Sequence, residues 1–378
     1  MSSLYHRIGI QSLIFLLGLV FLFPQDLSAK PPILSKRYQN KSPGRVIRTC
    51  CAFGSDLRYI GVPFVKRNDI IDRKELGLHH FMGGRHEKNG IIYTQHGGFI
   101  DIGHLRDYAD WTAYLYVQIE LNKSEINSTT IKLGAEGGKK RLSFNVSNDM
   151  TSLDHLNLAG SIAYDLSLWH EIATYFGVSL IPVILPEKFS SFSPEDVYSN
   201  LLGTIIGMKA IESEKEYDIA VTAILDEILD HLGAVDQIEE SYAAMSQVES
   251  LWWNSKKPLP GKKFLLKRNL DTAIELLPWL VDDDSNSVAY TLPKPDSQIR
   301  KMYTLSLRLN EKFPLDDILP KDKTREINQH DFQSFVNYIK QKDQEEKDAE
   351  EALILKRAKK RYINLLKKVN NDHRRSSK

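Results

Sequence analysis

Runs of apolar residues repeating every three to four positions predict several helices in this chain. The pattern Leu105, Tyr108, Leu115 and Ile119 predicts a helix over about Leu105–Leu121. Further helices are predicted over the segments Asp154–Phe176, Ser193–Ile211, Tyr217–Leu232 and Val235–Trp252. Glycines at 177 and 233 follow two of these segments, as expected at helix C-termini.

Short alternating or β-branched stretches predict a smaller amount of β-structure. Ile91–Thr94 and Phe99–Ile102 have the composition of strands. Thr129–Leu133 and Lys139–Val146 flank a Gly-containing turn and predict a β-hairpin. The expected fold class is therefore α+β and helix-rich, with a small strand part near the N-terminal side packed on a bundle of helices.

The first 29 residues have the organisation of a secretory signal peptide. Ile8–Phe23 is an apolar run preceded by Arg7, and Leu27-Ser28-Ala29 is an expected cleavage site before Lys30. The run is shorter than the ~20 apolar residues of a membrane-spanning helix. We therefore predict export to the periplasm or cell envelope, with an uncleaved N-terminal anchor as the alternative.

Composition divides the rest of the chain. Residues 30–45 read as a linker, 46–320 as a single domain, and 321–378 as a charged and partly helical tail. The tail holds six acids in residues 341–351, followed by ten Lys or Arg in residues 355–378. This basic end predicts contact with an anionic envelope or membrane surface, or a solvated helix. Across all 378 residues the net charge is only +1, which gives no reason to expect nucleic-acid binding.

Histidine and glycine are concentrated between residues 77 and 104, and this segment leads to the first candidate site. His104 is expected in the first turn of a helix, with Asp107 three residues later on the same face and Asp101 just before the helix. Such residues can bind a divalent metal such as zinc, or can cap the helix N-terminus. Arg106 and Asp110 are interpreted as a surface ion pair.

A second polar pair, His170 and Glu171, interrupts an otherwise apolar helix. It resembles half of a His-Glu-x-x-His zinc motif, but position 174 is Thr. Buried polar residues need partners, so we expect His104 with Asp107 to meet His170 with Glu171 at the floor of a pocket edged by residues 83–98. The ligands would be His104, Asp107 and His170, with Asp101 in reserve and Glu171 as general base. A structural hydrogen-bond network is the alternative.

The two cysteines, Cys50 and Cys51, are adjacent. Their Cα atoms are ~3.8 Å apart across a trans peptide, which is too close for an ordinary disulfide. Cys51 is therefore either a small buried side chain or a nucleophile with His104 or His170 as its base.

Several blocks of sequence resemble a bacterial exported family of unknown function. They are CCAFG from Cys50, GGFIDIGHLRDYADWTAYL from Gly97, AYDLSLWHEIATYFG from Ala163 and SPEDVYSNLLGTIIG from Ser193. The resemblance covers roughly residues 45–285 and implies a Gram-negative envelope protein, without implying an activity. Three functions stay open: a metal-dependent hydrolase, a Cys-His hydrolase, and a non-catalytic envelope binding or structural protein.

Overall fold

The computed structural model describes most of the chain from Lys30 to Ser376. The described residues are 30–44, 47–48, 51–54, 57–59, 62–67, 69–123, 128–147, 149–178, 190–256, 265–271, 275–281, 292–293, 296, 298–319 and 324–376. The predicted signal peptide and Cys50 lie outside these residues.

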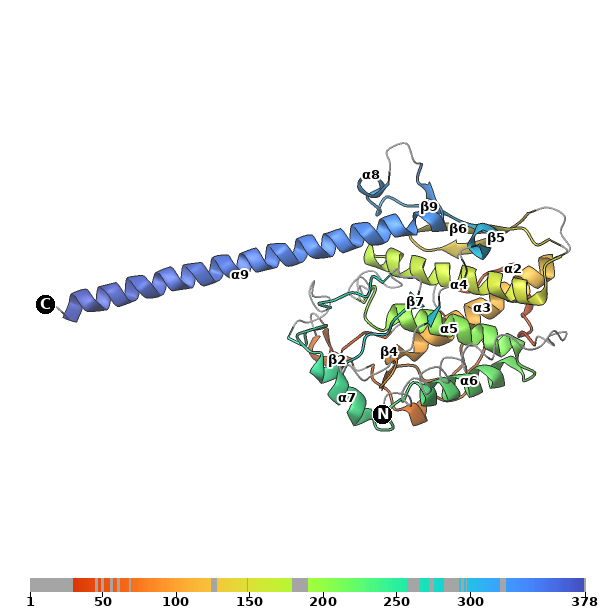
Figure 1. The fold of residues 1–378 in the computed structure, drawn as a ribbon, viewed down its shortest axis with the longest axis horizontal. Helices are drawn as coiled ribbons and strands as arrows, with labels where there is room; N and C mark the ends of the chain where they lie inside the picture. Colours follow the sequence, from red (N-terminus) through yellow and green to blue (C-terminus); the bar gives the residue numbers. More distant parts are fainter. Residues whose placement is uncertain are drawn as a thin grey trace, which may run out of the picture.

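Three helices form the centre of the domain (Figure 1). They are α3 (Ile102–Asn122), α4 (Ser152–Tyr175) and α5 (Asp196–Glu212), and each packs against the other two. Gly203 of α5 faces α3 so closely that a Cβ atom there would lie 2.1 Å from the Leu105 carbonyl oxygen. Only glycine permits this approach, which brings the start of α5 beside the start of α3.

The starts of α3 and α4 are fixed by side-chain caps. The Asp101 carboxylate accepts hydrogen bonds from the backbone N–H groups of Gly103 and His104. Thr151 and Asp154 form a reciprocal capping box at the start of α4. Gly177, with φ of +78°, follows the end of α4 as predicted.

A four-stranded antiparallel sheet covers α4 on the side away from α5 and α6 (Figure 1). Its order is β10 (Glu326–Ile327), β9 (Tyr303–Leu309), β6 (Gly138–Phe144) and β5 (Thr129–Ala135). The β5–β6 hairpin was predicted from the sequence. β9 was not, although its buried and exposed residues alternate regularly from Tyr303 to Leu309.

A second hairpin precedes the central helices, as predicted. It consists of β3 (Ile91–Thr94) and β4 (Gly98–Asp101), and α3 begins directly after β4. The mixed α+β, helix-rich fold class is thereby confirmed.

Several predicted helix boundaries differ from the structure. α5 begins at Asp196 and not at Ser193, because residues 194–195 form a turn. α6 (Tyr217–His231) agrees with its prediction, but α7 covers only Ile238–Gln247 of the predicted Val235–Trp252. Ser250, with φ of +65°, and the bridge between Glu249 and Trp253 replace the last helical turn.

The last helix, α9 (Phe332–Ser376), begins inside the domain and then extends far beyond it (Figure 1). Its first two turns bury Phe332, Phe335, Val336 and Ile339, so the packed part of the chain continues past residue 320. The remaining short elements complete the described fold: α2 (Lys36–Asn40), β1 (Leu57–Tyr59), β2 (Val62–Arg67), η1 (Arg73–Glu75), β7 (Glu275–Leu276), β8 (Leu292–Pro293), η3 (Ile299–Lys301), α8 (Leu315–Ile318) and η4 (Gln329–Asp331). Among the described helices, none has the length and apolar character to span a bilayer.

Candidate metal site

His170 projects from α4 and is oriented by a glutamate from the β5–β6 turn. Its Nδ1 lies 2.7 Å from Oε1 of Glu136, and Oε2 of Glu136 lies 2.7 Å from the Lys140 ammonium. All three side chains are buried. Although burial alone would raise the pKa of Glu136, Lys140 and His170 lower it to about 2. The ionised Glu136 therefore holds the proton of His170 on Nδ1 and leaves Nε2 as the free ring nitrogen.

His104, in the first turn of α3, lies beside a carboxylate of a neighbouring helix, without the hydrogen bond that orients His170. Its Nδ1 lies 3.1 Å from Oδ1 of Asp196, the first residue of α5. The close packing of α5 on α3 at Gly203 supports this contact. Both histidines thus have a carboxylate oxygen near Nδ1, and in His170 the two atoms are hydrogen-bonded.

Glu171, next to His170, is held by the segment that leads into α5. The backbone N–H of Phe192 donates to Oε2 at 2.6 Å, and Asn200 approaches Oε1 at 3.4 Å. Phe192 has φ of +55°, an uncommon backbone conformation for a bulky residue. One carboxylate oxygen of Glu171 is therefore well satisfied, and the other has only a long contact.

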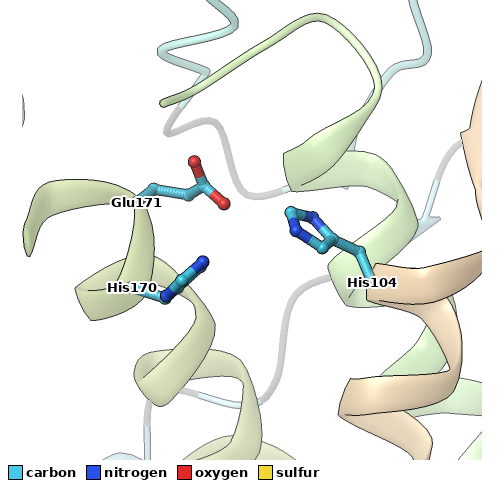
Figure 2. A group of neighbouring side chains, drawn as sticks. All are labelled: His104, His170 and Glu171. Atoms are coloured by element: carbon cyan, nitrogen blue, oxygen red, sulfur yellow. The ribbon is translucent and has the colours of Figure 1, made fainter. Parts of the chain in front are cut away.

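These three side chains converge between α3 and α4 (Figure 2). The imidazole rings of His104 and His170 have centroids 5.9 Å apart and planes at 83°. One ligand atom from each of His104, His170 and Glu171 can be chosen so that all lie within 4.8 Å of one another. Asp101, His104 and Asp196 form a second such group, so His104 belongs to both.

The electrostatics of this region favour a cation. Burial, together with the negative charge of Asp196, raises the pKa of Glu171 to about 7, and burial also raises the pKa of Asp101. Glu195 is buried beside them, and burial together with Asp196 and Asp101 raises its pKa strongly. Among the described residues, none of these four carboxylates forms an ion pair with Lys or Arg. A divalent ion would neutralise this concentration of buried acids.

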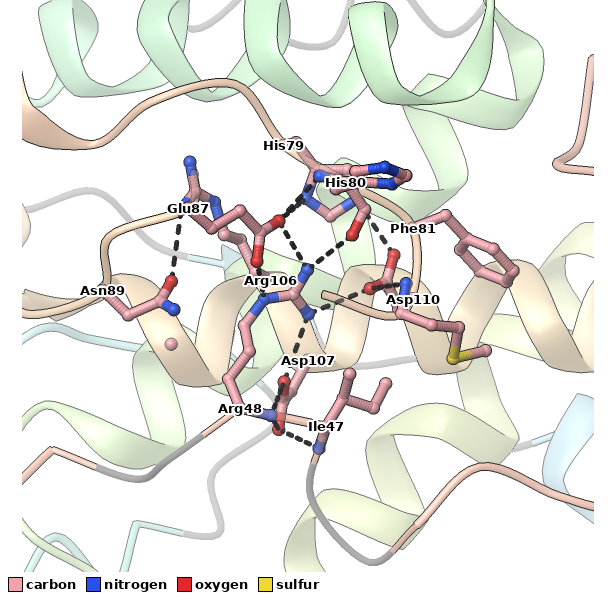
Figure 3. Close-up of polar contacts among 12 residues, drawn as sticks. Ile47, Arg48, His79, His80, Phe81, Glu87, Asn89, Arg106, Asp107 and Asp110 are labelled. Atoms are coloured by element: carbon pink, nitrogen blue, oxygen red, sulfur yellow. Dashed lines mark hydrogen bonds and ion pairs between the residues drawn. The ribbon is translucent and has the colours of Figure 1, made fainter. Parts of the chain in front are cut away.

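Asp107 does not join this group, although it was predicted as a ligand. It accepts hydrogen bonds from the backbone N–H groups of Ile47 and Arg48, and the Arg48 guanidinium lies 3.2 Å away (Figure 3). Burial raises the pKa of Asp107 to about 6, although Arg48 opposes this shift. Asp107 therefore anchors the N-terminal segment to α3.

Arg48 is the centre of a second, separate polar network (Figure 3). It pairs with Glu87 at 2.7 Å and with Asp110 at 2.9 Å, and Asp110 also lies 3.0 Å from His79. The interpretation of Arg106 and Asp110 as a surface ion pair was wrong, because both are fully buried. Arg106 instead donates to the backbone carbonyls of residues 76, 77 and 88.

Cys51 lies between the candidate metal site and a surface pocket. Its buried thiol hydrogen-bonds to Asp101 and is free of any disulfide. The pocket has a volume of about 600 Å³, and its lining residues are Ile47, Arg48, Cys51, Asp69, Met82, Gly83, Gly84, Arg85, Glu87 and Asn89. Gly83 and Gly84 edge this pocket as expected, but the predicted metal ligands are not among its lining residues.

Sequence reasoning missed three acids of the site. Glu136 falls in the turn of the predicted hairpin, and Glu195 and Asp196 fall at the start of the helix predicted over Ser193–Ile211. The available signal for Asp196 was weak, because acids are common in first helical turns whatever the function. No local pattern connects Glu136 with His170, which lies 34 residues away in the sequence.

The fold and the site define a helix-rich α+β domain with a buried two-histidine and carboxylate centre. The chain belongs to a family described as protein of unknown function (DUF4056), whose model matches residues 38–282. This match contains α3, α4, α5 and every residue of the site. No curated protein and no solved structure matches the chain.

Proposed function

We propose that this protein is a metal-dependent hydrolase of the cell envelope, in which His104, His170 and Glu171 bind a divalent ion such as zinc. The observation that carries the proposal is the convergence of these three buried side chains from two helices. Two histidines and one glutamate are the protein ligands of a well-known class of catalytic zinc centres, in which water takes a further position. Bound there, the ion would activate that water for attack on an ester, amide or glycosidic bond.

The residues fit such an ion in three respects. Nδ1 of His170 is hydrogen-bonded to Glu136, as is usual for a metal-bound imidazole, and Nδ1 of His104 lies 3.1 Å from Asp196. Glu171 keeps one oxygen with only a long hydrogen-bond contact. The surrounding acids would balance the charge of the ion. This arrangement favours Glu171 as a ligand over the general-base role expected from the sequence.

Elemental analysis of protein purified without chelator tests the metal site. We expect a stoichiometric divalent ion in the wild type and its loss in His104→Ala and in His170→Ala. His155→Ala is the matched control, because His155 is a buried histidine on the same helix as His170 and also pairs with a glutamate, Glu120. Metal in His104→Ala and His170→Ala at the wild-type level would refute the site. Folded, metal-free wild-type protein that gains no stability from added zinc would also refute it.

A Cys-His hydrolase is the second candidate, because Cys51 lies near the candidate metal site and also lines the surface pocket. In this case the thiol would attack the substrate and His104 would accept its proton. Cys51→Ser distinguishes the two candidates: it should abolish hydrolysis by a thiol nucleophile and leave metal content and metal-dependent hydrolysis largely intact. If metal-loaded, reduced protein hydrolyses no substrate in panels of esters, peptides and glycans, the non-catalytic alternative is favoured.

Export is part of the same proposal and is supported by the sequence of residues 1–29. N-terminal sequencing of the protein from its native cells should begin at Lys30. A retained Met1 in the membrane fraction would instead indicate an uncleaved anchor.

A further inference from the structure

α9 is anchored at one end only. Phe332 and Phe335 pack on Trp169 of α4, with ring centroids 5.5 and 6.1 Å apart. Asp343 still contacts the domain through Arg268, at 3.3 Å. Beyond this point nearly every side chain through Leu365 is exposed, and the helix projects away from the body of the domain (Figure 1). A helix that projects alone gains no stability from packing. The outer part of α9 would therefore be stabilised by binding a partner.

The outer part of α9 carries an apolar stripe. Leu355, Ala358, Tyr362 and Leu365 follow one another at three- and four-residue steps and therefore share one face of the helix. Leu355 is 70% exposed, and Tyr362 and Leu365 are each 62% exposed. Ile354 borders this face, and in the sequence the same spacing continues through Leu366 and Val369.

Basic residues flank the stripe on both sides. At about 100° per residue, Lys359 and Lys356 fall on one flank, and Arg361 and Arg357 on the other. Residues 355–368 contain seven Lys or Arg and no acid. A basic amphipathic helix of this kind is typical of segments that lie in the plane of an anionic membrane surface.

A second copy of the chain fits the stripe less well. In a parallel pair, the basic flanks of the two helices would lie side by side and repel. In an antiparallel pair, the stripe would meet the acidic half of α9, where the same face carries Gln344, Lys347, Asp348 and Glu351. Asp348 and Glu351 would pair with the basic flanks there, but the apolar stripe would face polar and charged side chains and find no apolar partner. Anionic lipid satisfies both features, because headgroups pair with the basic flanks while the acyl boundary accepts the apolar residues.

We propose that residues 354–365 of α9 bind flat on an anionic lipid surface and hold the domain next to the membrane. The proposal is independent of the metal site. It places the helix on the membrane surface and not across the bilayer.

Co-sedimentation with vesicles tests this proposal. We expect the protein to bind vesicles of equal parts phosphatidylglycerol and phosphatidylcholine at least tenfold more tightly than vesicles of phosphatidylcholine alone, with binding weakened by salt. The triple variant Leu355→Gln, Tyr362→Gln, Leu365→Gln should lose at least tenfold in affinity. Lys356→Glu combined with Lys359→Glu, which reverses the charge of one flank, should do the same while keeping the stripe.

Leu251→Gln is the matched control, because Leu251 is 58% exposed but lies in the domain and outside α9. It should bind vesicles like the wild type. Equal binding to the two vesicle types, or wild-type binding by the triple variant, would overturn the proposal. Self-association in analytical ultracentrifugation that the triple variant abolishes, without any lipid binding by the wild type, would show that the partner is a second copy.

Discussion

At the scale of single residues, the site depends on carboxylates that lie beside histidines. Glu136 is hydrogen-bonded to Nδ1 of His170, and Asp196 lies 3.1 Å from Nδ1 of His104, so two unrelated segments place a carboxylate beside the histidines. Fixing the proton on one ring nitrogen determines which nitrogen remains for an ion, and therefore the direction of the ligand.

Glu136→Gln is expected to weaken metal binding without removing a ligand. An amide of the same size cannot hold the Nδ1 proton of His170 as strongly, and loss of such a partner typically costs 10- to 100-fold in affinity. Competition with a chelating dye measures this change. Glu120→Gln, which alters the corresponding partner of His155, should leave the affinity unchanged; an unchanged affinity in Glu136→Gln would contradict the positioning role.

Arg48 illustrates a buried charge whose contribution to stability depends on pH. Despite the opposing effect of burial, contacts with Arg48 lower the pKa of Glu87, and contacts with His79 and Arg48 lower the pKa of Asp110. Acids with lowered folded-state pKa values stabilise the fold above their unfolded pKa values near 4, and this contribution is lost as the pH falls below them.

Arg48→Met should therefore cost about 3–5 kcal/mol at pH 7, because it leaves buried carboxylates without their cation. In the variant, protonation of these acids relieves the cost, so the difference from the wild type should shrink between pH 7 and pH 4. Urea unfolding at several pH values measures it. A difference that stays constant or grows toward acid pH would show that the charge of Arg48 does not stabilise the ionised forms of Glu87 and Asp110.

At the scale of elements, the site requires the close approach of α5 to α3. Gly203 permits it, and Gly207 one turn later lies against Ala109 in the same way. The caps at Asp101 and Thr151 determine where α3 and α4 begin, and so determine where His104 and His170 lie along each helix.

Gly203→Ala should separate the two helices and disturb the site. Its Cβ atom would meet a backbone oxygen that cannot rotate away, so we expect a loss of about 1–3 kcal/mol in stability together with weaker metal binding. Gly160→Ala is the control, because its Cβ atom would meet the flexible side chain of Met208. Chemical unfolding of both variants, with metal titration, tests this; equal effects would show that the backbone contact is unimportant.

At the scale of the whole molecule, a packed domain and a projecting helix coexist in one chain. The domain includes the sheet and the first turns of α9, whereas the outer part of α9 is exposed.

Removal of residues 348–378 should therefore change stability by less than about 0.5 kcal/mol, the usual limit for surface changes. Thermal unfolding measures the effect. Truncation after Asn328, which also removes Phe332 and Phe335, should destabilise the domain severely; a large loss on the shorter deletion would show that the outer helix packs.

The sequence by itself determined the helix-rich α+β class, most helix positions and two of the hairpins, because hydrophobic period, caps and glycine stops act within a few residues. It also indicated His104, His170 and Glu171, because polar residues in apolar helices stand out locally. Only the tertiary structure decided their partners. Asp107 pairs with Arg48. Asp196, from α5, and Glu136, from the β5–β6 turn, lie beside the two histidines. The strand Tyr303–Leu309 joined β6 from more than 150 residues away in the sequence. Such pairings depend on how buried surfaces fit together, and no local pattern encodes that fit.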